Sequence, residues 1–363
     1  MLTTAPTGVS QGDGTVGDGA TGATSAASAD DSSDGGTKLD VGMGMASADD
    51  GGDGDGCDKV DFLFVIDNSG SMGDEQQNLI NSFPQFINTI QTELDEAQDY
   101  HVMVLDVDAW VFEQCPALCA ATPPPPPECL DAMGDCDPTL GLPCLFSCEL
   151  ANGLCGGGFE CGVTVPEMCE DVLGAGVVHP KGTGSSDVDC NFSSGARYID
   201  MSEPDISAAF SCAARVGTSS SAGTERPMEA MVNAVTPSTD AFACNEGFIR
   251  DDAILVVTFI TDENDMGDSG GTVAGWKQAL VAAKKGDESA IVVLGLFGDG
   301  DQPNPTCSLN DDAEVAPWLR MFVESFGTNG IAGSVCAASY DQFFQQAVGL
   351  IDTTCDEFIP PEG

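Results

Sequence analysis

Three short, almost wholly apolar segments limit the folds open to this chain more than any other feature. They read VDFLFVI at Val60–Ile66, AILVVTFIT at Ala253–Thr261 and AIVVLGLF at Ala290–Phe297. Each has the length of a β-strand but lacks the alternation of polar and apolar residues found in a strand with one solvent-exposed face. Such continuous apolar runs are typical of strands buried on both faces of a parallel sheet. We expect a further strand at His101–Val107 (HVMVLDV).

Segments of helical periodicity separate these runs. Between Leu79 and Leu94 the apolar residues recur at spacings of one, three and four, which predicts an amphipathic helix. Further helices are predicted over Val273–Lys285, Ala316–Phe326 and Tyr340–Ile351. Strands that alternate with helices predict an α/β fold, here a Rossmann-like domain with a mostly parallel central sheet flanked by helices.

Two parts of the chain lie outside this pattern. Residues 1–56 consist almost entirely of Gly, Ala, Ser, Thr and Asp and contain no aromatic residue, so we expect a disordered tail that serves as a solubiliser or a tether. Residues 115–169 hold nine cysteines and poor periodicity, which predicts a disulfide-rich insertion over 115–190. The α/β domain is then expected over 57–355, with a C-terminal tail at 356–363.

Cysteine usage predicts disulfides and an oxidising compartment. The chain has 16 Cys, an even number, but only 2 His and no C-x2-C unit of the kind that binds zinc. Cys190 and the nine cysteines of the insertion are enough for five bridges. For the remainder, our hypotheses pair Cys57 with Cys355, Cys307 with Cys336, and Cys212 with Cys244, although sequence alone does not define pairing.

The start of the chain shows no secretory signal, because Met1 is followed by neither a basic nor an apolar region. We interpret it as a mature or wrongly started form of an exported protein, with a lipid anchor upstream of the tail as one way of attachment. The longest apolar runs reach about a third of the roughly 20 residues that a membrane-spanning helix needs. Direct membrane insertion is therefore not expected.

The charge excludes several classes of partner. With 59 Asp and Glu against 11 Lys and Arg, the formal net charge is −48. Nucleic-acid binding requires a basic face, and so does docking on an anionic membrane surface. Residues 1–56 hold ten Asp and one Lys, so most of the negative charge belongs to the part expected to fold.

Hydroxyl and carboxylate side chains follow the predicted strands at one edge of the sheet. The first strand runs into Asp67-Asn68-Ser69-Gly70-Ser71, and the run that ends at Thr261 is followed by Asp262. A third loop presents Thr224 just before a segment predicted to be helical. Ligands of open parallel sheets sit at the carboxyl ends of the strands, and oxygen donors of this kind suit Mg²⁺.

The order of these motifs resembles the von Willebrand factor A (VWA) family. A D-x-S-x-S turn after the first strand, a distant threonine loop and a Thr-Asp pair after a later strand are its metal-ion-dependent adhesion site, or MIDAS. The resemblance covers roughly residues 58–110 and 190–352. It implies that Asp67, Ser69, Ser71, Thr224 and Asp262 surround a Mg²⁺ ion, with Mn²⁺ and Ca²⁺ as alternatives.

The resemblance also implies a function. In that family the serine hydroxyls bind the cation directly, the aspartates act directly or through water, and an Asp or Glu of a protein ligand completes the coordination. We therefore expect a metal-dependent protein-binding or adhesion module on the surface of a bacterial cell. The alternatives are a structural surface protein stabilised by disulfides and cations, and an accessory subunit that recruits an enzyme complex.

Catalysis by the chain itself is not expected. The sequence holds no G-x-S-x-G elbow, H-E-x-x-H pair, phosphate-binding G-x4-G-K-[ST] loop or dinucleotide-binding glycine motif after a strand. With every cysteine open to pairing, no free thiol is needed as a nucleophile. His179 lies in a Gly/Ser-rich stretch and is interpreted as an ordinary loop residue.

Overall fold

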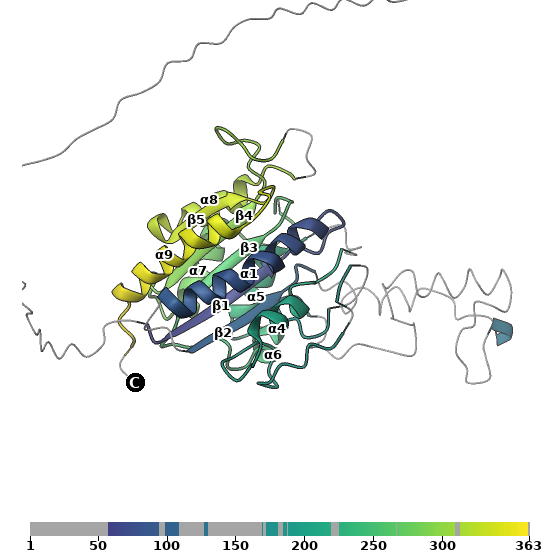
Figure 1. Cartoon of the computed structure of the whole chain (residues 1–363), viewed down its shortest axis with the longest axis horizontal. Helices are drawn as coiled ribbons and strands as arrows, with labels where there is room; N and C mark the ends of the chain where they lie inside the picture. The colour runs from purple at the N-terminus through teal and green to yellow at the C-terminus, as the bar shows by residue number, and fades with distance from the viewer. Residues whose placement is uncertain are drawn as a thin grey trace, which may run out of the picture. The chain divides into compact units, whose positions relative to one another are not determined.

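Five strands form one sheet in which every neighbouring pair is parallel, in the order β2-β1-β3-β4-β5 (Figure 1). The strands are β1 (Lys59–Ile66), β2 (Asp99–Leu105), β3 (Ile254–Ile260), β4 (Ile291–Phe297) and β5 (Gly330–Ser334). The α-helices are α1 (Gly73–Glu93), α4 (Ile206–Ala213), α5 (Pro227–Val235), α6 (Asp240–Cys244), α7 (Val273–Ala283), α8 (Pro317–Glu324) and α9 (Asp341–Glu357). Two short 3-10 helices are η1 (Pro127–Cys129) and η4 (Gly327–Asn329).

This computed structural model describes residues 57–93, 99–108, 127–129, 169, 172–180, 184–186, 188–218, 225–265, 267–308 and 313–361. All of them belong to the unit Gly52–Gly363. The predicted N-terminal tail and nearly all of the predicted insertion lie outside the described residues, so the domain boundaries stay predictions.

The sheet is buried on both faces because successive side chains of each strand enter different cores. Phe62 and Phe64 of β1 pack in one core with α1, α4 and α9. Leu63 and Val65 of the same strand pack in the other core with α5, α7 and α8. Figure 1 shows α1 and α9 crossing the same face of the sheet. This double burial explains the unbroken apolar runs and confirms the α/β class with a parallel central sheet.

The predicted elements agree with the structure in kind and differ at their ends. The second strand is β2 at Asp99–Leu105, which is shifted from the predicted His101–Val107. The first helix begins at Gly73 rather than at its first apolar pair, because its opening turn is polar. The sequence analysis missed α4, α6 and β5.

A loop segment covers the outer edge of β2. Val102 and Ile199 exchange two backbone hydrogen bonds of 2.8 Å as an antiparallel bridge, and Val177 donates its N–H to the carbonyl of Val104 at 2.8 Å. An open strand edge is a template for unwanted pairing, so this cover protects the sheet.

Four disulfides are described, and two match the sequence hypotheses. Cys57–Cys355 joins the segment before β1 to α9, and Cys307–Cys336 is also present. The expected Cys212–Cys244 pair is wrong, because Cys190 bonds Cys212 and Cys169 bonds Cys244. The insertion is therefore not a closed set of ten cysteines, since two of its members are bonded to helices of the α/β part. None of the described cysteines is free.

Salt should stabilise this strongly acidic chain. A net charge of −48 opposes the compact state through self-repulsion. Raising NaCl from about 0.01 M to about 1 M shortens the Debye length from about 30 Å to about 3 Å. We expect a gain of about 1 kcal/mol, or roughly 2–4 °C in Tm for a domain of this size. Thermal unfolding followed by circular dichroism measures it, and an unchanged Tm contradicts it.

Candidate metal centre

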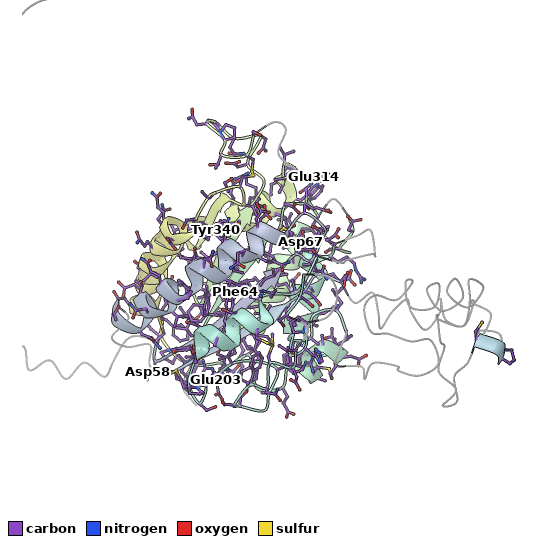
Figure 2. All side chains as sticks on the ribbon, turned by 45° about the vertical axis from the view of Figure 1, so that its right-hand side comes forward. Asp58, Phe64, Asp67, Glu203, Glu314 and Tyr340 are labelled. Atoms are coloured by element: carbon purple, nitrogen blue, oxygen red, sulfur yellow. A yellow bond between two sulfur atoms is a disulfide. The ribbon has the colours of Figure 1, made fainter. Side chains whose placement is uncertain are left out.

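The candidate centre lies at the carboxyl ends of β1 and β3, two neighbouring inner strands of the sheet. From β1 the chain continues to β2 on one side, whereas from β3 it continues to β4 on the other. The loops that leave these strands diverge at such a point, and ligands of open α/β sheets bind there. Asp67 directly follows β1, and Asp262 lies two residues beyond β3. Figure 2 labels Asp67 at this edge of the sheet.

Asp67 is held rigidly by its neighbours. Its backbone N–H donates to the carbonyl of Ile260 at 2.9 Å, which continues the pairing of β1 with β3. One carboxylate oxygen accepts the N–H of Ser69 at 2.7 Å, and the other accepts the Thr261 hydroxyl at 2.5 Å. The side chain is fully buried. The turn therefore fixes a carboxylate at the bottom of the site.

The two serines of the turn lie next to the second carboxylate. The Ser69 hydroxyl donates to Oδ1 of Asp262 at 3.3 Å and lies 3.3 Å from the hydroxyl of Ser71. Ser69 and Asp262 are buried, whereas Ser71 is exposed. The structure thus brings together four of the five predicted ligands. The fifth, Thr224, lies outside the described residues.

Negative charge at this edge is poorly compensated. Burial raises the pKa of Asp67 to about 7, with contributions from the charges of Asp262 and Glu225. Burial also raises the pKa of Asp262, and hydrogen bonds from the hydroxyls of Ser71 and Ser69 partly oppose this rise. The pKa of Glu263 rises to about 8 through burial and a hydrogen bond with Glu225. A cation bound here would favour the charged carboxylates.

The residues after the threonine loop are anchored to the same edge. Arg226 donates its backbone N–H to the carbonyl of Val107, two residues beyond β2, at 2.9 Å. Asp265 accepts the N–H of Met228 at 3.2 Å and that of Ser269 at 2.9 Å. The carboxylate of Asp265 thus accepts one of the free N–H groups in the first turn of α5, as a helix-capping group does.

Gln76 is a structural partner of the site that the sequence analysis missed. Its side-chain amide donates to the carbonyls of Asp67 at 2.9 Å and Gly217 at 2.7 Å, and its oxygen accepts the N–H of Gly217 at 3.3 Å. This buried side chain therefore ties the D-x-S-x-S turn to the segment that precedes the threonine loop. No local pattern reveals it, because Gly217 lies 141 residues away in the sequence.

Replacing Gln76 should destabilise the fold. The Gln76→Leu variant leaves two buried carbonyls without their donor, which we expect to cost about 2–3 kcal/mol of unfolding free energy. Urea titration measures the loss. The matched control is Gln77→Leu, at the neighbouring exposed position, which should change stability by less than about 0.5 kcal/mol. Equal stability of both variants contradicts the bridging role.

The donor set fits a hard divalent cation. It consists of carboxylate and hydroxyl oxygens, the ligands that Mg²⁺ and Ca²⁺ prefer, and it carries excess buried negative charge. Within the described ranges, no group of three or more His, Cys, Asp and Glu side chains is arranged to hold a metal ion. The predicted ligand set contains only two carboxylates, those of Asp67 and Asp262, and its other donors are hydroxyls. It is therefore a different kind of site from a group of three or more His, Cys, Asp and Glu.

The described helices include none that is long and apolar enough to cross a membrane. No protein-family model matches this chain, and no curated protein matches it by sequence comparison.

Proposed function

We propose that this chain is a VWA-like module that binds a protein ligand through a divalent cation. The observation that carries the proposal is the convergence of Asp67, Ser69, Ser71 and Asp262 at the switch point of the sheet. Mg²⁺ is the proposed ion, with Mn²⁺ or Ca²⁺ as substitutes, and Thr224 is the proposed fifth ligand. Catalysis is not part of the proposal.

Open coordination positions, rather than leftover charge, support a ligand that brings a carboxylate. Asp67 and Asp262 together neutralise one divalent ion, and the hydroxyls of Ser69 and Ser71 add oxygen donors without charge. A cation bound by few protein ligands keeps water molecules that an Asp or Glu side chain of a partner can replace. The bound ion supplies Lewis acidity and charge, while this chain's residues orient it.

We infer that the module acts outside the cytoplasm, at the surface of a bacterial cell. Four described disulfides fit an oxidising compartment. The acidic N-terminal tail, residues 1–56, is proposed to tether the module to the cell surface. The role of the cation as a purely structural element is the competing proposal. It predicts a loss of stability in EDTA without any loss of a binding partner.

A capture experiment tests the proposal. The full chain is immobilised and exposed to extracted surface proteins in Mg²⁺ or in EDTA, with Asp67→Ala as the control protein. We expect a defined partner that the wild type retains in Mg²⁺ and releases in EDTA, and that Asp67→Ala does not retain. Equal recovery by both proteins contradicts the proposed function.

A further inference from the structure

The outer face of α8 is apolar where a surface helix is normally polar. Val315, two residues before α8, and Trp318 and Met321 on the helix expose 45%, 40% and 46% of their surfaces, and Pro317 is exposed beside them. The spacing of three residues places Trp318 and Met321 on one side of the helix. The opposite side is buried in the core through Leu319, Phe322 and Val323. We call the exposed set Val315, Trp318 and Met321 the α8 stripe.

The α8 stripe adjoins the candidate metal centre. Glu314, the residue before Val315, donates its backbone N–H to the carbonyl of Asp262 at 2.7 Å. Trp318 donates its backbone N–H to the side chain of Asn264 at 3.3 Å. The loop that carries Asp262 therefore contacts the start of α8 directly.

Acidic side chains border the stripe. Glu314 and Glu324 are exposed at its two ends, and Asp301 lies 3.8 Å from Arg320 of α8. Arg320 also contacts the Gly298 carbonyl and the ring of Phe297, so its charge is directed inward. A ligand with several carboxylates is repelled here, whereas apolar and basic groups are complementary to the surface.

We propose that the protein ligand presents one carboxylate flanked by large apolar side chains, within an otherwise basic segment. The carboxylate binds the cation, and an adjacent apolar side chain packs on the α8 stripe. This inference rests on the proposed function, because it assigns the neighbouring contacts of the same ligand. Exposed aromatic and methionine side chains beside a polar anchor are characteristic of binding surfaces.

Synthetic peptides test the inference. The probe Ac-Lys-Gly-Leu-Asp-Leu-Gly-Lys-NH2 is compared with a peptide in which both Leu are Ser, using the full chain in Mg²⁺ and fluorescence polarisation. Burying a leucine side chain is worth roughly a tenfold gain in affinity, so we expect at least about tenfold weaker binding of the serine peptide. Trp318→Ser should lose a similar factor for the leucine peptide. Ile359→Ser removes an apolar residue that is 74% exposed beyond α9 and should bind like the wild type.

The outcomes separate the two proposals. Calorimetry with Mg²⁺ alone is run first, and absence of Mg²⁺ binding overturns both. If Mg²⁺ binds and the serine peptide binds as tightly as the leucine peptide, the stripe has no role and the cation-dependent function stands. The inference is also overturned if Trp318→Ser matches the wild type, or if the leucine peptide shows no saturable binding up to about 1 mM.

Discussion

The Ser69→Ala/Ser71→Ala variant is expected to lose at least about 100-fold in Mg²⁺ affinity. The reason is that even residues that only orient a metal ligand contribute about 10–100-fold, and this variant removes two proposed direct ligands. Both hydroxyls lie within 3.3 Å of another polar atom of the site, Ser69 beside Asp262 and Ser71 beside Ser69. Isothermal titration calorimetry at a pH near 8 measures the affinity.

A matched control separates loss of ligands from loss of fold. Ser202→Ala/Ser289→Ala changes two exposed serines in other loops and should bind Mg²⁺ like the wild type. The turn itself should survive in the test variant, because Asp67 accepts its hydrogen bond from the backbone of Ser69, not from the hydroxyl. Unchanged far-ultraviolet circular dichroism confirms this. Wild-type affinity in the double alanine variant contradicts the ligand assignment.

The fold class could be predicted because burial on both faces gives each buried strand a continuous apolar run in the sequence. The missed strand β5 has no such run. Its sequence GIAGS has two glycines, and an added Cβ at Gly330 would lie 2.1 Å from the carbonyl oxygen of Val323. Close packing against α8 therefore selects against the bulky residues by which a strand is recognised.

The proximity of the two aspartates could be predicted, whereas the contacts that support them could not. Asp67 and Asp262 follow apolar runs, and the ends of parallel strands meet at one edge, so local patterns indicate their proximity. Gln76 and the α8 stripe are placed at the site by contacts with distant residues that no local pattern identifies. The disulfides show the same limit, since Cys212 bonds Cys190, only 22 residues away in the sequence, instead of Cys244.

In EDTA, the unfolding free energy should fall as the pH rises from about 5 to about 8. The pKa of Asp67 is about 7 in the folded protein and 3.8 as its ordinary value. Between these values the folded state holds a proton that the unfolded state has lost, so stability decreases with increasing pH. Asp67 alone accounts for about 2–3 kcal/mol over this range, at 1.36 kcal/mol per pKa unit. Glu263, whose pKa is raised to about 8, acts in the same direction.

Mg²⁺ should reverse much of this loss. The cation binds deprotonated carboxylates, so it competes with protons and stabilises the fold more at pH 8 than at pH 5. Thermal unfolding at both pH values, in Mg²⁺ and in EDTA, gives the four Tm values needed. The cation-induced rise in Tm is expected to be several-fold larger at pH 8.

The Asp67→Asn variant isolates the contribution of the buried carboxylate. An asparagine oxygen can still accept the N–H of Ser69, and its amide can donate to the hydroxyl oxygen of Thr261, so the turn keeps its shape. Burial lowers the pKa of His101, which has the opposite effect on the pH dependence of stability, and subtracting the variant from the wild type cancels that contribution. In EDTA at pH 8 the variant should be the more stable protein, and Mg²⁺ should no longer raise its Tm. A stability difference between wild type and variant that stays the same from pH 5 to pH 8 in EDTA, or a variant that Mg²⁺ still stabilises, contradicts a cation site built on Asp67.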